Sequence, residues 1–186
     1  MSSSRERIIE TAERMVREQG AAAVTMAAVA RESDVSRQMV YLHFANRSGL
    51  FTAITHHLDG EAKLRERFAE ALEREPSVAL EEVMRIWLGY LPRILPVDRE
   101  LYATALTGGE GAEAWAERMD ELRRLFRFAA RRVELREPWT PETAADWIFT
   151  RTHLAVWDAL VTGRDWSPGE MVDRTVLATL DELVGA

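Results

Sequence analysis

The sequence predicts an all-α protein of about nine helices, with a three-helix N-terminal domain followed by a larger C-terminal helical domain. Apolar residues recur at helical spacing along the whole chain, and the alternating apolar and polar runs that are typical of strands are missing. Polar residues suited to helix capping precede several of these apolar periods. With 186 residues, 47% of them hydrophobic, the chain can bury a sizeable core without disulfides or structural metals.

Composition excludes several classes of site. The chain has no cysteine, which rules out disulfides, thiol nucleophiles and cysteine-ligated zinc or iron–sulfur centres. Its longest apolar run is five residues, Met26 to Ala30, whereas a membrane-spanning helix needs about 18. The N-terminus lacks the apolar core of a signal peptide. We therefore expect a cytoplasmic protein.

Charge is distributed unevenly along the chain. The formal net charge is −7, which by itself argues against nucleic acid as a partner. Residues 1–47, however, contain seven arginines and six acidic residues, a net charge of +1. All the net acidity therefore lies in the rest of the chain. The six tryptophans also lie at Trp87 or beyond. The two parts are therefore built differently, and we divide the chain into domains at 1–46 and 47–186.

Capping residues and glycine mark the N-terminal helices. A first helix is expected from about Ser4 to Gln19, with Gly20 as its stop. Thr25 and Ser36 are the expected N-caps of two short helices, and Asn46 caps a long one that weakens at Asp59-Gly60. The helix is expected to continue beyond that point through 64–72.

Prolines and a glycine-rich turn divide the C-terminal part. A helix restarts at Glu75-Pro76-Ser77, and Pro92 and Pro96 are expected to end or kink it, because each removes a backbone donor. Asp98 is then expected to cap a short helix. Further helices are expected over 112–135, over 141–161 after Thr140-Pro141-Glu142, and from the capping box Ser167-Pro168-Gly169-Glu170 onward.

Residues 26–44 meet the requirements of a helix-turn-helix, two short helices joined by a turn of three to four residues. Ala30 is small where the helices must cross closely. Asp34 occupies the turn position that usually requires a left-handed conformation. Ser36 then caps the second helix, so that backbone amides and the side chains of Arg37 and Gln38 are available at an N-terminus suited to phosphates and base edges.

Residues 5–58 resemble the N-terminal domain of the tetracycline-repressor (TetR) family of transcriptional regulators. The matching segments are "RERIIETAERMVREQG" and "VTMAAVARESDVSRQMVYLHFANRSGLFTAI". The departures are Asp34 in place of glycine, and Arg47-Ser48-Gly49-Leu50 where the family often has Lys-Glu-x-Leu. The resemblance implies a sequence-specific DNA-binding regulator, most often a repressor, that acts as a homodimer on a palindromic operator and is released by a small apolar or aromatic effector. It implies neither cofactor nor enzymatic activity.

The resemblance also implies which residues bind DNA. Arg37 and Gln38 would contact base edges, Arg to guanine and Gln to adenine. The remaining candidates would contact phosphates and fix the docking: Thr25, Ser36, Tyr41, His43 and Arg47. Alternatively, Arg37 and Gln38 form only a solvated helix face, Tyr41 and His43 pack under the recognition helix, or the whole motif binds protein.

The helix expected over 141–161 indicates dimerisation independently of the family. It is apolar nearly all round and must therefore be buried all round, although a terminal helix has few partners within its own chain. Together with the last helix it supplies the predicted dimer interface: Phe149, Val156, Leu160, Val172, Val176 and Leu180. The alternative is that both helices are central in the monomer.

The aromatic C-terminal part has two interpretations. Aromatic residues at helical spacing usually form core, but here they can also line an apolar effector pocket with a few polar anchors. The candidates for that pocket are Trp87, Tyr90, Tyr102, Trp115, Met119, Trp147, Arg151 and His153. His153 can equally be a core histidine with its hydrogen bonds satisfied.

No residue pattern predicts a metal site or an enzyme. His56 and His57 are followed by Asp59 and Glu61, but adjacent histidines on a helix point about 100° apart and make a poor pair of ligands. No glycine-rich phosphate loop, zinc-protease motif or nucleophile elbow occurs. The remaining alternative is a DNA-binding regulator of the same fold that lacks an effector and is controlled by a protein partner.

Overall fold

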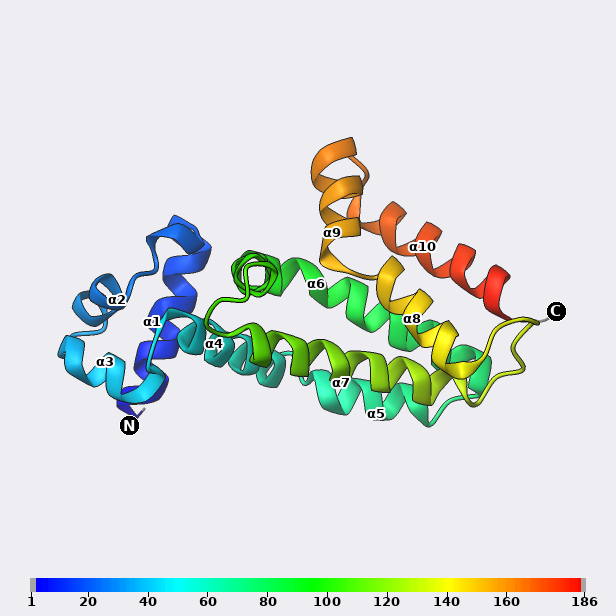
Figure 1. Cartoon of the computed structure of the whole chain (residues 1–186), viewed down its shortest axis with the longest axis horizontal. Coiled ribbons are helices and arrows are strands. Elements are labelled where there is room, and N and C mark those ends of the chain that lie inside the picture. Colours follow the sequence, from blue (N-terminus) through cyan, green and yellow to red (C-terminus); the bar gives the residue numbers. More distant parts are fainter. Residues whose placement is uncertain (1–2, 185–186) are drawn as a thin grey trace. The chain divides into compact units, whose positions relative to one another are not determined.

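The computed structural model describes residues 3–184 and confirms the all-α fold class with an N-terminal helix-turn-helix (Figure 1). Within these residues the only β-type pairing is an isolated bridge between Leu135 and Val184. The elements are α1 (Ser4–Gln19), η1 (Ala21–Ala23), α2 (Met26–Glu32), α3 (Arg37–Phe44), α4 (Arg47–Glu61), α5 (Leu64–Leu72), α6 (Pro76–Leu106), α7 (Ala112–Ala130), α8 (Pro141–Arg151), α9 (Leu154–Trp157), η2 (Asp158–Thr162) and α10 (Pro168–Leu183).

The chain packs as two compact units. Unit 1 contains the residues up to Ala62 together with Arg93–Glu117, and unit 2 contains Lys63–Pro92 and the residues from Arg118 onward. In unit 1, α4 contacts α1 and α3, and its Leu50 and Ile54 are fully buried. Packing therefore joins α4 to α1 and α3. The division after residue 46 remains a prediction about function.

Helix caps expected from the sequence are present at the start of most elements. The hydroxyl groups of Thr25 and Ser36 accept hydrogen bonds from the backbone amides of Ala28 and Met39. Asn46, Thr140 and Ser167 cap α4, α8 and α10 in the same way. These local signals are reliable because the donor and acceptor lie within three residues of each other.

The expectation that Pro92 or Pro96 ends a helix was wrong, and a kink at these residues stays a prediction. Both prolines lie inside α6, which continues without interruption from Pro76 to Leu106. The apolar face also continues past them, since Leu91, Ile94 and Val97 are all buried. Burial of these side chains offsets the lost backbone hydrogen bonds, a cost of about 3 kcal/mol for each interior proline. Asp98 therefore lies within the helix and does not cap a new one.

The helix expected over 141–161 is also not continuous. It ends at Arg151, and Thr152 and His153 separate it from α9. The Nδ1 atom of His153 accepts the backbone amide of Ala155 at 3.2 Å, so His153 is the N-cap of a new helix. The side chains after His153 therefore do not continue the helical register of α8.

Unit 2 has its own apolar core, formed by fully buried side chains of four helices. Leu80 and Met84 come from α6, Phe126 from α7, Ile148 from α8 and Met171 from α10. None of the described helices has the length and apolar content that crossing a bilayer requires.

Candidate nucleic-acid interface

The turn between α2 and α3 has the conformation that the motif requires. Asp34 adopts a left-handed conformation with φ of 52°, as predicted. The buried Ser33 hydroxyl donates to the Val29 carbonyl at 2.6 Å, and the Val35 amide donates to the Ala30 carbonyl at 3.1 Å. These bonds satisfy the last carbonyls of α2 and fix the direction in which α3 leaves the turn.

A small shared core holds α2 and α3 together. Val29 and Val40 are fully buried, and Ala30 is nearly so, which allows the two helices to approach closely. Phe44 closes the same face of α3, one helical turn after Val40. With Val40 and Phe44 on the inner face, the opposite face of α3 is presented outward.

The N-terminus of α3 carries the two predicted base-reading residues in exposed positions. Arg37 and Gln38 are both exposed, directly after the Ser36 cap. The Arg37 guanidinium lies over the Tyr41 ring, 5.6 Å from its centroid, and Nη2 of Arg37 is 3.5 Å from the Tyr41 hydroxyl. Stacking on Tyr41 restricts the arginine side chain while leaving it in solvent, which lowers the entropy cost of a directed contact.

The predicted phosphate-binding residues differ in their exposure. Thr25, Ser36 and Tyr41 are exposed, whereas His43 is half-buried with its ring 5.9 Å from that of Phe44. Tyr41 therefore faces solvent, and the alternative of packing under the recognition helix describes His43 better than it describes Tyr41.

Arg47, for which the family resemblance implied a phosphate contact, has three partners within unit 1. Its Nε donates to the Val24 carbonyl and its Nη2 to the Ala21 carbonyl, each at 2.8 Å, and Nη1 pairs with Glu100 at 2.7 Å. The guanidinium also lies 4.4 Å from the centroid of the Phe51 ring. We revise the expectation accordingly, because each guanidinium nitrogen of Arg47 already holds a partner within unit 1.

Sequence reasoning missed Leu42, a large apolar side chain that is 77% exposed on α3. It lies two residues from both Val40 and Phe44, which are buried. Residues at that separation point to the other side of a helix, so the sequence could have placed Leu42 on the outer face. An apolar side chain exposed beside Tyr41 suits contact with the methyl group of thymine.

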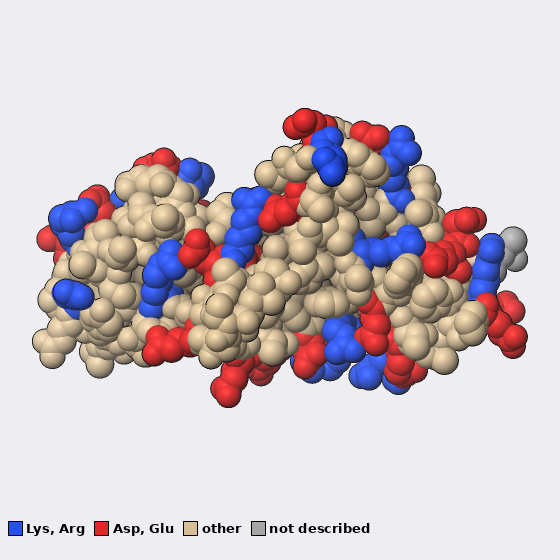
Figure 2. All heavy atoms as spheres, turned by 45° about the horizontal axis from the view of Figure 1, so that its top comes forward, with Lys and Arg blue, Asp and Glu red and all other residues tan. Residues whose placement is uncertain are grey.

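Basic groups form no continuous surface on the face shown in Figure 2, where arginine and lysine side chains are interspersed with acidic ones. Non-specific attraction to phosphates grows with the number of neutralised charges. Because the charges up to Arg47 also sum to only +1, we expect DNA binding by this part to rely on a few directed contacts.

The residues expected to bind an effector form pairs, most of them inside the two cores. Trp87 and Tyr90 are buried in unit 2 with ring centroids 6.4 Å apart, and the Trp87 indole donates to the Thr152 carbonyl at 3.1 Å. Tyr102 and Trp115 pair at 5.7 Å in unit 1. Met119 is buried in unit 2.

Trp147, Arg151 and His153 all have polar partners. Both Trp147 Nε1 and Arg151 Nη2 donate to Glu182 of α10, at 3.1 and 2.6 Å, and the Arg151 guanidinium lies over the Trp147 ring. His153 caps α9, and its burial lowers its pKa. The interpretation of His153 as a histidine with its hydrogen bonds satisfied agrees with this geometry.

The predicted dimer residues are mostly half-buried within the single chain: Phe149, Val156, Leu160, Val172 and Leu180. Val176 is different, because it is fully buried inside unit 2 and offers no surface to a partner. The neighbouring Leu177 is 58% exposed, which the sequence did not predict.

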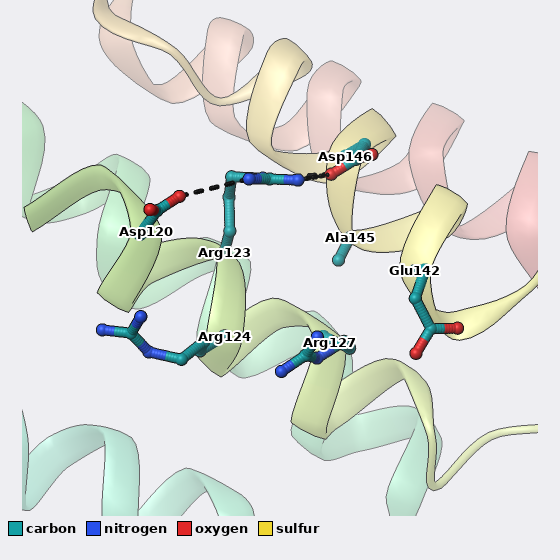
Figure 3. Close-up of a pocket in the computed structure, with 7 residues that line it drawn as sticks. All are labelled: Asp120, Arg123, Arg124, Arg127, Glu142, Ala145 and Asp146. Carbon is teal, nitrogen blue, oxygen red and sulfur yellow. Dashed lines mark hydrogen bonds and ion pairs between the residues drawn. The ribbon is translucent and has the colours of Figure 1, made fainter. Parts of the chain in front are cut away.

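A surface hollow of about 250 Å³ lies between α7 and α8 in unit 2 (Figure 3). Its lining is Asp120, Arg123, Arg124, Arg127, Glu142, Ala145 and Asp146. Arg123 lies between Asp120 and Asp146, and hydrogen bonding to Asp146 raises its pKa. This charged hollow contains none of the residues expected to bind an effector and has the wrong chemistry for an apolar one.

Comparison with protein-family models gives the same family that the helix-turn-helix segment resembles. Residues 8–54 match the family model described as "Bacterial regulatory proteins, tetR family". A sequence search of characterised proteins gave no significant match.

Solved structures share the fold over nearly the whole chain. NalD from Pseudomonas aeruginosa, the secondary repressor of the MexAB-OprM multidrug efflux pump, has a TM-score of 0.70 and 21% identity, with 97% of this chain and 96% of NalD covered. A transcriptional regulator from Rhodococcus sp. Rha1 has a TM-score of 0.74 and 20% identity, covering 99% and 100% of the two chains. The SmeT–triclosan complex gives 0.72 and 18%, covering 99% and 93%.

Proposed function

The chain belongs to the TetR family of bacterial regulatory proteins through its helix-turn-helix domain, and on that premise we propose that it is a homodimeric repressor released from a palindromic operator by a small apolar or aromatic effector. TetR-family regulators are DNA-binding transcription factors and not enzymes, and this chain is a DNA-binding transcriptional regulator of that family. We place its action in the cytoplasm, where bacterial DNA is accessible to it.

The observation that carries the proposal is the exposed N-terminal turn of α3. Arg37 and Gln38 both face solvent there, next to a capped helix start. An arginine can bind the O6 and N7 atoms of guanine with two hydrogen bonds, and a glutamine can bind the N6 and N7 atoms of adenine. We assign base reading to these two residues and docking on phosphates to Thr25, Ser36, Tyr41 and His43.

Dimerisation follows from the small size of one recognition module. A single helix reads only a few base pairs, so useful affinity requires two modules on half-sites about one or more helical turns apart. We assign the interface to the half-buried apolar residues of α8 to α10, together with the exposed Leu177. These side chains gain burial only if a second chain covers them.

The effector is proposed to be apolar or aromatic because of the tryptophan-rich C-terminal part. SmeT, which shares the fold, has been solved as a complex with triclosan, a small aromatic compound. An effector releases DNA only if it binds the DNA-free conformation more tightly than the DNA-bound one. We propose that this difference changes the separation of the two recognition modules.

The alternative regulator without an effector has one observation in its favour. The Trp87 ring is buried and its only polar donor is already bonded to the Thr152 carbonyl, as expected of a core residue. A thermal-shift screen with small aromatic compounds separates the two regulators. Stabilisation by one of them together with loss of DNA binding supports an effector, and release of DNA by a protein partner alone supports the alternative.

Selection of bound sequences from random duplexes, at physiological salt, tests the proposal directly. A palindrome with half-sites about one turn apart is the expected product. Mass spectrometry of the protein before selection identifies any co-purified small molecule that would hold it in the released state. Failure to enrich any sequence, with a folded and ligand-free dimer, would overturn the proposed function.

A further inference from the structure

Three potential metal ligands from two helices meet in unit 1. Glu13 belongs to α1, while His57 and Glu61 lie one helical turn apart on α4. The Nε2 atom of His57 is 3.8 Å from a carboxylate oxygen of Glu13 and 3.5 Å from one of Glu61. One ligand atom from each residue lies within 4.8 Å of the other two.

The sequence does not predict this arrangement, because its most evident pair of metal-ligating residues is the adjacent pair His56 and His57. The structure agrees that the two imidazoles diverge, since His56 is exposed while His57 is half-buried and faces Glu13. The additional ligand comes from α1, 44 positions before His57. Only the packing of α1 on α4 brings it into place.

Each carboxylate has one oxygen paired with an arginine and the other directed toward His57. Glu13 Oε1 accepts from Arg17 Nη1 at 3.4 Å, and Glu61 Oε2 accepts from Arg93. Glu13 Oε2 and Glu61 Oε1 are the atoms nearest to His57 Nε2. Such outer partners orient the ligands of metal sites by fixing which oxygen is free to coordinate.

We propose that Glu13, His57 and Glu61 form a binding site for a divalent transition-metal ion of the zinc type. In a tetrahedral zinc site with bonds of 2.0–2.1 Å, neighbouring ligand atoms lie about 3.3 Å apart. The distances from His57 Nε2 to the two carboxylates are close to that separation, so small side-chain rotations suffice. Water would complete the coordination of an ion with three protein ligands.

The ligand set also determines which ions bind. An imidazole nitrogen with two carboxylate oxygens suits Zn²⁺, Co²⁺ or Ni²⁺, whereas Mg²⁺ and Ca²⁺ prefer oxygen ligands alone. The site is therefore expected to bind Zn²⁺ and Co²⁺ and to ignore Mg²⁺.

Bound metal would join α1 to α4 by coordinate bonds and so stabilise the folded unit. A ligand that binds only the folded state raises the unfolding temperature, and the stabilisation grows with the logarithm of the ratio of free ligand to the dissociation constant. This consequence does not depend on DNA binding, and its failure would leave the proposed function untouched.

Isothermal titration of the chelator-treated, full-length protein with ZnCl₂ tests the site, with Co²⁺ absorption as a second readout. One site per chain is expected, with a rise in unfolding temperature for Zn²⁺ and none for MgCl₂. The variants H57A and E13Q should each weaken zinc binding by at least about tenfold, the loss that even an outer-shell partner can cause.

The chain provides a matched control in His56, which is the same residue type on the next position of the same helix. H56A should bind zinc as the unmodified protein does. Circular dichroism and metal-free unfolding of each variant verify that the fold is intact, and E13Q preserves the test if H57A fails to fold. Absence of zinc binding, or equal binding by H56A, H57A and E13Q, would overturn the proposal and leave an ion-pair cluster.

Discussion

The guanidinium of Arg47 donates a hydrogen bond from Nε to the backbone carbonyl of Val24, 2.8 Å away, immediately before the Thr25 cap of α2. A second bond reaches Ala21 in η1, and an ion pair reaches Glu100 in α6. One side chain at the start of α4 therefore fixes the segment that leads into the recognition motif. We therefore propose that its contribution to DNA binding is indirect.

Replacement of Arg47 by alanine is expected to cost stability and not base preference. It removes two hydrogen bonds from a charged donor to backbone carbonyls, and such bonds contribute about 1.5–3 kcal/mol each when well shielded. Because Arg47 is about one-third exposed, we expect a total loss near the lower value. Urea unfolding measures it. If the variant instead keeps its stability and shows a weaker salt dependence of DNA binding, the result would support a phosphate contact by Arg47.

Replacement of Arg37 by alanine is expected to relax preference at one base pair of each half-site, by about 1–3 kcal/mol for a two-bond contact to guanine. Stability should change by less than about 0.5 kcal/mol, because the side chain is exposed. Competition binding with single-base operator variants measures the effect. Y41F removes the hydroxyl of a residue assigned to phosphate docking, so it should instead weaken binding to all sequences alike. Uniform weakening on all sequences would instead make Arg37 a phosphate contact.

Replacement of Leu42 by serine is expected to weaken binding to operators with A·T pairs under the middle of α3, while the unfolding temperature stays within error. The side chain is 77% exposed and contributes little to the core. Uracil in place of thymine lacks the methyl group and so tests whether Leu42 contacts it. This change in the DNA should weaken binding of the unmodified protein and leave binding of L42S unchanged. Equal sensitivity of both proteins to uracil would contradict the assignment.

Acidification is expected to destabilise unit 2 through His153. Burial lowers the pKa of this imidazole below its ordinary value of 6.5, so the unfolded chain binds a proton more readily than the folded one. Stability is therefore fully present above about pH 6.5 and decreases as the pH falls through and below that value. Thermal unfolding between pH 5 and 8 measures it. H153N keeps a capping oxygen but does not titrate, so its stability should vary less with pH. If H153N shows the same pH dependence as the unmodified protein, a group other than His153 causes it.

Introduction of a charge at the predicted dimer interface is expected to give monomers. Phe149 is half-buried in the single chain, so F149E should keep the helical circular dichroism spectrum while preventing apolar contact with a second copy. Sedimentation at micromolar concentration measures it. V172A is a milder control that should stay dimeric, and a dimeric F149E would move the interface away from α8.

The sequence by itself determined the local parts of this protein: the caps at Thr25 and Ser36, the left-handed turn at Asp34, and the outward position of Arg37 and Gln38. These features depend on residues within one or two helical turns, and their physical cause lies in the adjacent backbone.

The tertiary structure decided what depends on distant partners. Packing places the carbonyls of Ala21 and Val24 and the carboxylate of Glu100 beside Arg47. It also lets α6 continue past Pro92 and Pro96, and it brings Glu13 close to His57. In each case the local pattern allowed another outcome, because the free energy that decides it comes from burial and contacts between helices far apart in the sequence.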